Sequence, residues 1–375
     1  MQFAADCSYG ERVDEGVIFM SRENNFDLLR VISTIAVILI HVNYMFFQYH
    51  WMNPSMGDSI YVVESFLNIV TRFSVPCFVL LSGAFILRDE RNRNFRMFYR
   101  KAGYKIFLPL VGVILLLLGL DEVYVALGNH KFLSPLKGIL TGGFFNLWYM
   151  YMLCGLYLLA PVIIRMKECL SLRQYHLVTV GMLLWACISQ ATSHYSIAYS
   201  GGVVAAYISY FMAGDVIHSL PLRKEARYKI IPIILVVLSI ILAFVARYLG
   251  VTYYLFDAYT NFFSPAVMVY SLSLFYLFKY ITFSVNCSWL SGKTFYIYMF
   301  HTLFIVIIDK GLHRFLPQNE LWAIALVLLV VFVLAMVSAI FYDHLWKMAE
   351  RDWNSKGVCQ EFCVNRFNKQ HRIAA

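Results

Sequence analysis

Two residues that could carry out chemistry lie within one apolar stretch of the chain, residues 25–47. Arg30 and His41 are eleven residues apart, so on a helix both side chains project from the same face, about 16 Å apart along its axis. In a membrane span an imidazole can relay a proton and a guanidinium can bind an anion. Asp27, three residues before Arg30, can pair with it. The structural alternative is that Arg30 reaches the membrane interface and His41 hydrogen bonds another helix.

A second apolar stretch, residues 64–87, carries Arg72 near its middle. Pro76 follows four residues later, removes a backbone donor and crowds the carbonyl group of Arg72, so we expect a kink or break here. A mid-span arginine beside a broken helix is typical of anion sites in transporters and membrane enzymes. Ser82 and Gly83 are small enough to let another helix approach closely. The structural alternative is a kinked helix in which Arg72 pairs with an acidic residue elsewhere.

Three further residues are weaker candidates. Trp148 lies at the start of an apolar stretch, where an aromatic residue of the membrane interface needs no special role. Asp215 lies near the end of another stretch and could be the partner in an ion pair. His301 lies halfway along a third, and taken alone it is better explained as a hydrogen-bonded structural histidine.

Several familiar kinds of site are missing from the sequence. The eight cysteines show no paired metal-ligand spacing, so we predict no metal site. The sequence contains no Walker loop, G-x-S-x-G elbow, H-E-x-x-H motif or Rossmann fingerprint. These observations argue against ATP-driven transport, serine hydrolysis in a known fold and zinc chemistry.

The elements that must position the candidate residues are membrane-spanning helices. The chain of 375 residues is 60% hydrophobic and only 14% charged, and its mean hydropathy is +0.65, which excludes an ordinary soluble domain. We therefore predict an all-α, polytopic transmembrane helix bundle with about ten spans. The apolar windows that predict them are residues 26–48, 60–87, 106–120, 145–164, 175–192, 201–218, 230–248, 261–278, 294–309 and 321–344.

The basic residues predict the orientation of this bundle. The loop at residues 88–105 alone carries seven Lys or Arg, and most of the others fall in loops on the same side. By the positive-inside rule these loops and both termini are cytoplasmic, which agrees with an even number of spans. The net charge of +9 thus reflects membrane topology and not binding to nucleic acid. We divide the chain into a short N-terminal tail without a signal peptide (1–25), a membrane domain (26–345) and a basic C-terminal tail (346–375).

The candidate residues also occur within motifs that follow one another in the order of a known family. The motifs are "FDLLR" with Arg30 and His41, "RFSVPCFVLLSG" (72–83), "FYRKAGYKIFLPL" (98–110), "LWY" (147–149) and "YIYMFH" (296–301). Over roughly residues 25–345 the chain resembles the acyltransferase-3 family of integral membrane O-acyltransferases. Within that family it is similar to the type that acetylates enterobacterial common antigen, which also lacks an appended soluble esterase-like domain.

This resemblance implies an enzyme of the bacterial inner membrane. It would transfer an acyl group, usually acetyl from cytoplasmic acetyl-CoA, to a hydroxyl of a cell-surface or lipid-linked glycan. Carried over, His41 would be the catalytic histidine and Arg30 its companion, while Arg72 and Trp148 match further family positions. Asp27, Asp215 and His301 would have supporting roles. A neutral imidazole can take the proton of the attacking hydroxyl, and the basic loop would attract the polyanionic donor.

Two other functions remain open at this point. A transporter or flippase of a glycan or lipid intermediate would use the arginines to bind a phosphate and His41 to relay protons, although we find no inverted repeat of the transporter kind. A structural or regulatory subunit would leave the three ionisable residues of the first two spans without a packing role. The acceptor, the length of the acyl group, the side of the membrane on which transfer ends and the oligomeric state are not specified by the sequence.

Overall fold

The computed structural model describes the backbone of residues 24–51, 59–126, 147–191, 199–249, 262–281, 284–312 and 321–373. Side chains are described for residues 24–46, 61–122, 147–189, 206–249, 262–281, 284–311 and 321–348. The predicted N-terminal tail therefore lies outside the described residues apart from its last two, and so do the side chains of the predicted basic tail after Met348.

The described part of the chain is helical and contains no strand, which confirms the all-α prediction. The first half comprises α1 (Asn24–Trp51), α2 (Ser59–Thr71), α3 (Ser74–Ile86), the 3₁₀ turn η1 (Glu90–Arg93), α4 (Phe95–Ala102), the π-helical turn η2 (Gly103–Phe107), α5 (Leu108–Ala126) and α7 (Trp148–Cys169). The second half comprises α8 (Leu172–Ala191), α9 (Tyr199–Ser219), α10 (Arg227–Tyr248), α11 (Pro265–Phe278), α12 (Ser288–Ser291), α13 (Thr294–Leu312) and α14 (Leu321–Ile373).

Six helical stretches among the described residues are long and apolar enough to cross a membrane. They are Asn24–Phe46, Tyr61–Ile86, Phe95–Glu122, Trp148–Cys169, Arg227–Tyr248 and Leu321–Met348. The other four predicted windows coincide with α8, α9, α11 and α13, which are helical but do not meet the same criteria; α11, for example, is apolar but has only 14 residues. The chain is thus a polytopic membrane protein, with six candidate spans in the part that the structure describes.

The second predicted span is broken at Arg72, as expected from Pro76. Helix α2 ends at Thr71 and α3 begins at Ser74, so Pro76 lies in the first turn of α3. A proline is tolerated there because the amide groups of a first turn have no partner within the helix. The break leaves Arg72 on the short connection between the two helices, inside the membrane-spanning stretch.

Helices α3 and α9 pack backbone against backbone through two glycines. A Cβ atom on Gly83 would lie 1.7 Å from the carbonyl oxygen of Phe211, and one on Gly214 would lie 2.0 Å from the carbonyl oxygen of Leu80. Each glycine therefore faces the main chain of the other helix, and no side chain fits at either position. The predicted close approach is confirmed at Gly83.

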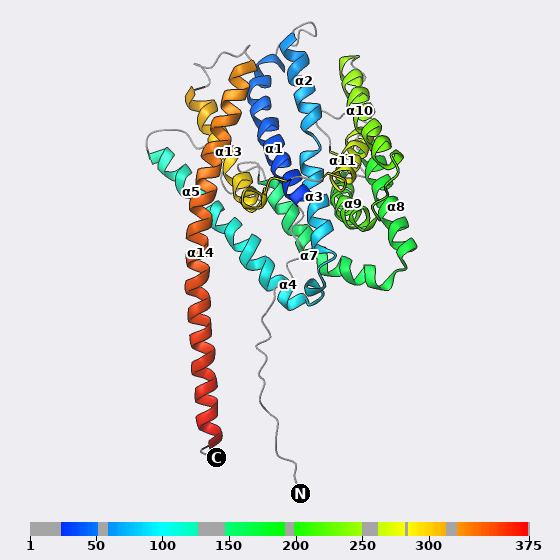
Figure 1. Ribbon diagram of the computed structural model, residues 1–375. Coiled ribbons are helices and arrows are strands. Elements are labelled where there is room, and N and C mark those ends of the chain that lie inside the picture. Colours follow the sequence, from blue (N-terminus) through cyan, green and yellow to red (C-terminus); the bar gives the residue numbers. More distant parts are fainter. Residues whose placement is uncertain are drawn as a thin grey trace.

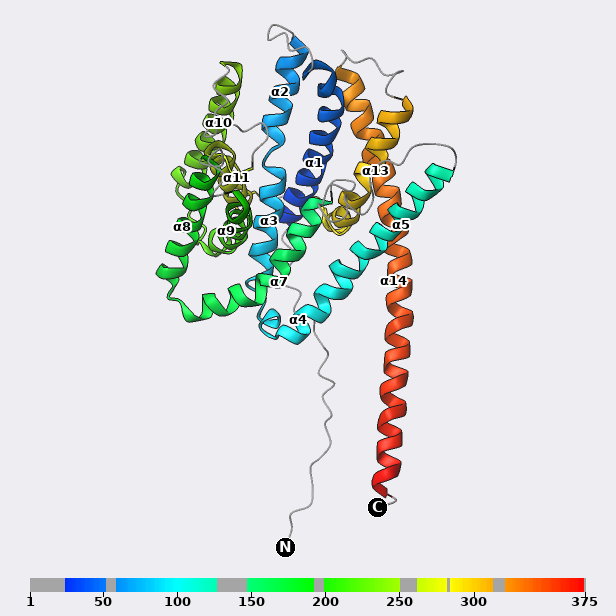
Figure 2. The same ribbon diagram turned by 180° about the vertical axis from the view of Figure 1, so that it is seen from behind.

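Helix α1 lies at the centre of the bundle, where it packs against α2, α3, α11, α12, α13 and α14. Helices α8 to α11 gather on one side of α1 to α3, and α5, α13 and α14 lie on the other (Figure 1). Seen from behind, α4 and α5 run obliquely across the bundle beside α7 and α14 (Figure 2). The apolar window of α1 is 61% buried and that of the α2–α3 stretch 67%, against 22% in α10, so the candidate residues of the first two predicted spans lie in well-enclosed parts of the protein.

Helix α14 is much longer than its predicted span. The window ended at residue 344, but the helix continues through the predicted basic tail to Ile373 and extends beyond the other helices (Figure 1). Apolarity marks only the part of a helix that crosses a bilayer, and the charged residues that follow favour a helix as well as they favour a loop.

Candidate active site

Two histidines from distant parts of the sequence lie together in the bundle. Helix α1 packs against α13, and this contact brings His41 and His301 to a distance of 5.2 Å between ring centroids, with the rings inclined by 47°. His301 is fully buried and His41 is partly exposed. The sequence alone favoured a structural histidine at position 301, whereas the structure makes it the neighbour of the candidate catalytic residue.

The tautomer of His301 follows from its hydrogen bond. Its Nδ1 lies 2.5 Å from the carbonyl oxygen of Tyr298, one turn earlier in α13. A carbonyl oxygen can only accept, so Nδ1 donates and Nε2 keeps its lone pair. Nε2 is buried and has no hydrogen-bond partner among the described residues. A basic nitrogen therefore lies next to His41 with its lone pair available.

Arg72 lies close to the same pair. Its Nε donates to Oδ1 of Asn68 over 2.8 Å, and its guanidinium stacks on the ring of Phe262 at 5.3 Å from the centroid. The guanidinium lies near enough to His41 for an electrostatic interaction between the two side chains. The break after α2 thus places a cation beside the histidine pair and holds it by a hydrogen bond and an aromatic ring.

Arg30 is held by a triangle of polar groups at the other end of α1. Its Nη1 lies 3.1 Å from Oδ1 of Asp27 and donates to Oγ of Ser291 over 2.9 Å, while Ser291 donates to the same Asp27 oxygen over 2.5 Å. The predicted pair of Asp27 and Arg30 is confirmed. The contribution of Ser291 was missed, because a serine 261 residues away carries no pattern that links it to α1.

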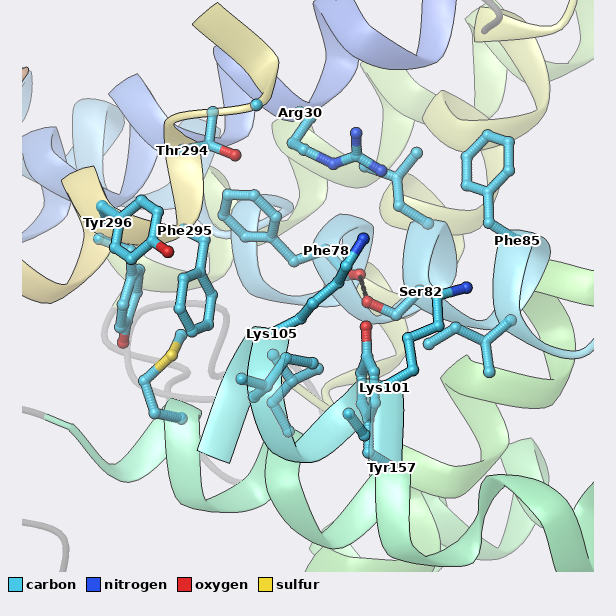
Figure 3. A pocket seen from close by; sticks show the side chains of 18 of the residues that line it. Arg30, Phe78, Ser82, Phe85, Lys101, Lys105, Tyr157, Thr294, Phe295 and Tyr296 are labelled. Carbon is cyan, nitrogen blue, oxygen red and sulfur yellow. Dashed lines mark hydrogen bonds between the residues drawn. The ribbon is translucent and has the colours of Figure 1, made fainter. Parts of the chain in front are cut away.

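A cavity of about 560 Å³ opens beside Arg30. Figure 3 shows side chains of α1, α3, α4 and α13 around it. Its walls are largely aromatic, from Phe78, Phe85, Phe98, Tyr149, Tyr157, Phe295, Tyr296 and Tyr298. Four cations also line it, namely Arg30, Lys101, Lys105 and Lys347. A cavity of this size and composition suits a ligand that has an aromatic or apolar part and negative charge.

The inner wall of the cavity leads to the histidine pair. Tyr298 lines the cavity, and its ring centroid lies 5.1 Å from that of His301. The ring of Tyr149 packs against that of Tyr298 with the centroids 4.9 Å apart and the planes inclined by 54°, and it lines the same wall. Tyr298 therefore connects the cavity wall to His301, and through it to His41.

The two remaining candidates have different surroundings. The ring centroids of Trp148 and Phe262 are 6.0 Å apart, and Phe262 is the ring over which the guanidinium of Arg72 lies. Trp148 therefore belongs to the surroundings of the histidine pair. Asp215 is buried elsewhere, in an ion pair of 2.7 Å with Lys167 that joins α9 to α7. The site therefore unites His41, His301, Arg72 and Trp148 at one end and Arg30 and Asp27 at the other, but not Asp215.

Comparison with known families identifies the kind of protein. A family model described as "Acyltransferase domain" (Acyl_transf_3) matches residues 23–340. The chain belongs to this acyltransferase family. The matched region of the acyltransferase includes both histidines, Arg72, and Lys101 and Lys105 of the cavity. No curated protein and no solved structure matched the chain.

The acyltransferase has no group of three or more His, Cys, Asp or Glu side chains that could hold a metal ion, as far as the described residues go. The groups that the site offers are imidazole nitrogens, guanidinium and ammonium groups and tyrosine hydroxyls. These suit proton transfer and the binding of an anion.

Proposed function

We propose that the protein is an O-acetyltransferase, which transfers an acetyl group from acetyl-CoA to a hydroxyl of a cell-surface or lipid-linked glycan. Membership of the acyltransferase family supports the class of reaction. The observation that carries the assignment of the site is the pair of His41 and His301, which lies behind an aromatic cavity with cationic walls. The cavity suits the donor, because coenzyme A combines an aromatic base, an apolar arm and phosphate groups.

In the proposed reaction His41 is the general base. The oxygen of the glycan hydroxyl attacks the thioester carbon while the hydroxyl proton passes to His41. The carbon–sulfur bond then breaks, and the thiolate takes the proton from the imidazolium, which restores neutral His41. Nε2 of His301 can accept a hydrogen bond from protonated His41, as a carboxylate does in a catalytic triad. Arg72 can stabilise the negative charge on the oxygen of the tetrahedral intermediate.

We further propose that the cavity opens to the cytoplasm and that all ten predicted helices span the membrane, with both termini cytoplasmic. Lys101 and Lys105 support this orientation, because they line the cavity and belong to the loop of seven basic residues. Acetyl-CoA would then enter on the side where cells make it. We also propose an acceptor of the enterobacterial common antigen type, in a bacterial inner membrane.

Replacement of His41 by alanine tests the proposal. The purified protein is incubated with radiolabelled acetyl-CoA and a glycan acceptor, and labelled glycan is counted. We expect His41→Ala to reduce transfer by about 10²- to 10⁴-fold, which is the usual contribution of a general base. The matched control is His344→Ala, because His344 is exposed on α14. Normal transfer by His41→Ala would contradict the role of His41, and a wild-type protein that forms no labelled glycan would favour a transporter.

A further inference from the structure

Two lysines of the cavity share one face of the helix that crosses the bundle. Lys101 lies in the last turn of α4, and Lys105 lies in the π-helical turn η2 that joins α4 to α5. In that turn the amide of Leu108 donates to the carbonyl of Gly103, five residues earlier. Pro109, which follows directly, has no amide for the carbonyl of Lys105, and a widened turn is one way for a helix to adapt to this loss.

Both lysines extend into the cavity. Figure 3 shows their side chains reaching from the helix toward the wall formed by Phe78, Ser82 and Phe85. Lysine side chains in an apolar membrane protein lie more favourably at the water interface. Here two lysine side chains reach side by side into an aromatic cavity, which raises the local positive charge. A bound anion would offset that charge.

The carboxylates of the cavity region are already engaged elsewhere. Asp343 pairs with both Lys293 and Lys347. Asp89 accepts three hydrogen bonds from the guanidinium of Arg91, at 2.8 to 3.2 Å, and lies 3.9 Å from Lys101. The hydrogen bond from Arg91 is the main reason why the pKa of the Asp89 carboxyl is lowered.

Lys105 has no ion pair with any of the side chains that the structure describes. Arg30, the other cation on this side, is bound to Asp27 and Ser291. The positive charge that is left for a ligand therefore lies at Lys105 and at Lys101, whose ion pair with Asp89 is long at 3.9 Å.

We propose that Lys101 and Lys105 form the phosphate-binding subsite for the nucleotide half of an acyl-CoA donor. This inference rests on the proposed function and assigns one end of the donor to one end of the cavity. Charge-assisted hydrogen bonds from the two ammonium groups would hold the phosphates, and the aromatic walls would hold the base. The pantetheine arm would then run toward Tyr298 and the histidine pair.

The test compares two probes that differ in their phosphates, coenzyme A and pantetheine, by equilibrium binding to the purified full chain in nanodiscs of neutral lipid. For the double variant Lys101→Gln/Lys105→Gln we expect the affinity for coenzyme A to fall about 10- to 100-fold, the usual effect of losing hydrogen bonds to charged groups. Affinity for pantetheine should stay the same. Lys101→Arg/Lys105→Arg keeps both charges and should retain most of the binding.

Lys224→Gln is the matched control, because Lys224 is exposed in the connection between α9 and α10 and does not line the cavity. Unchanged binding of coenzyme A by the double glutamine variant would overturn the proposal, and so would an equal loss for both probes. The outcome for the proposed function is separate. A wild-type protein that binds coenzyme A through these lysines but transfers no acetyl group would keep the subsite and reject the acetyltransferase.

Discussion

In the histidine pair, the bond between Nδ1 of His301 and the carbonyl oxygen of Tyr298 determines which ring nitrogen carries the proton. The two rings therefore have different tasks. His301 is fixed and fully buried, whereas His41 is partly exposed and can meet a substrate. A fixed acceptor beside a more accessible base is the arrangement expected when one residue moves the proton and the other stabilises the charged form.

Asparagine at position 301 separates these tasks. In His301→Asn the side-chain amide can still donate to the carbonyl oxygen of Tyr298, but no basic nitrogen replaces Nε2. We expect kcat for acetyl transfer to fall about 100-fold, while the KM for acetyl-CoA changes by less than about twofold, because the loss affects proton transfer and not donor binding. Steady-state kinetics of the purified variant, with His344→Asn as control, measure both constants. A kcat near the wild-type value would show that His301 is only structural.

At the scale of helices, the contact between α3 and α9 fixes the wall of the cavity. Phe78, Ser82 and Phe85 line the cavity from α3, and Gly83 of the same helix touches the backbone of Phe211 in α9. Because neither Gly83 nor Gly214 leaves room for a side chain, the two helices have one close register. The position of α3, and with it the position of the cavity wall, depends on that register.

Gly83→Ala tests this contact. The added methyl group would require α3 and α9 to move apart, and overpacking of this kind usually destabilises by about 1–3 kcal/mol. We expect a lower apparent unfolding temperature in detergent and weaker binding of coenzyme A. Gly155→Ala in α7 is the matched control, because nothing lies within 4 Å of a Cβ atom there and alanine is the better helix former. Equal unfolding temperatures for the two variants would mean that the contact is not close in solution.

The sequence predicted local features better than contacts between distant segments. The pair of Asp27 and Arg30, three residues apart, and the break before Pro76 follow from helix geometry, and both occur in the structure. His41 and His301 lie 260 positions apart, and their contact depends on the packing of α1 against α13, which no periodicity encodes. Family resemblance marked His301 as a candidate but did not say what it touches.

On the scale of the whole molecule, α14 joins the bundle to a long extension. Its 53 residues correspond to about 80 Å of helix, whereas the hydrocarbon core of a bilayer is about 30 Å thick. About half of α14 or more therefore lies outside the hydrocarbon core. The segment that contacts the bundle includes Asp343, which pairs with Lys293 at the start of α13 and with Lys347. Asp343 and Lys347 of this ion-pair cluster lie beyond residue 340, where the family match ends.

Truncation shows where the functional unit ends. A chain that stops after Met348 keeps the cluster, and we expect it to insert, bind coenzyme A and transfer acetyl groups at close to wild-type rates.

A chain that stops after Phe341 lacks Asp343 and leaves Lys293, only 12% exposed, without that partner. Breaking a buried ion pair by removing one partner typically destabilises by roughly 3–5 kcal/mol. We therefore expect the shorter chain to lose its folded form, seen as aggregation on size-exclusion chromatography, and Lys293→Met should partly restore it because methionine needs no counter-charge. Full activity of the shorter chain would place the end of the functional unit at the end of the family match.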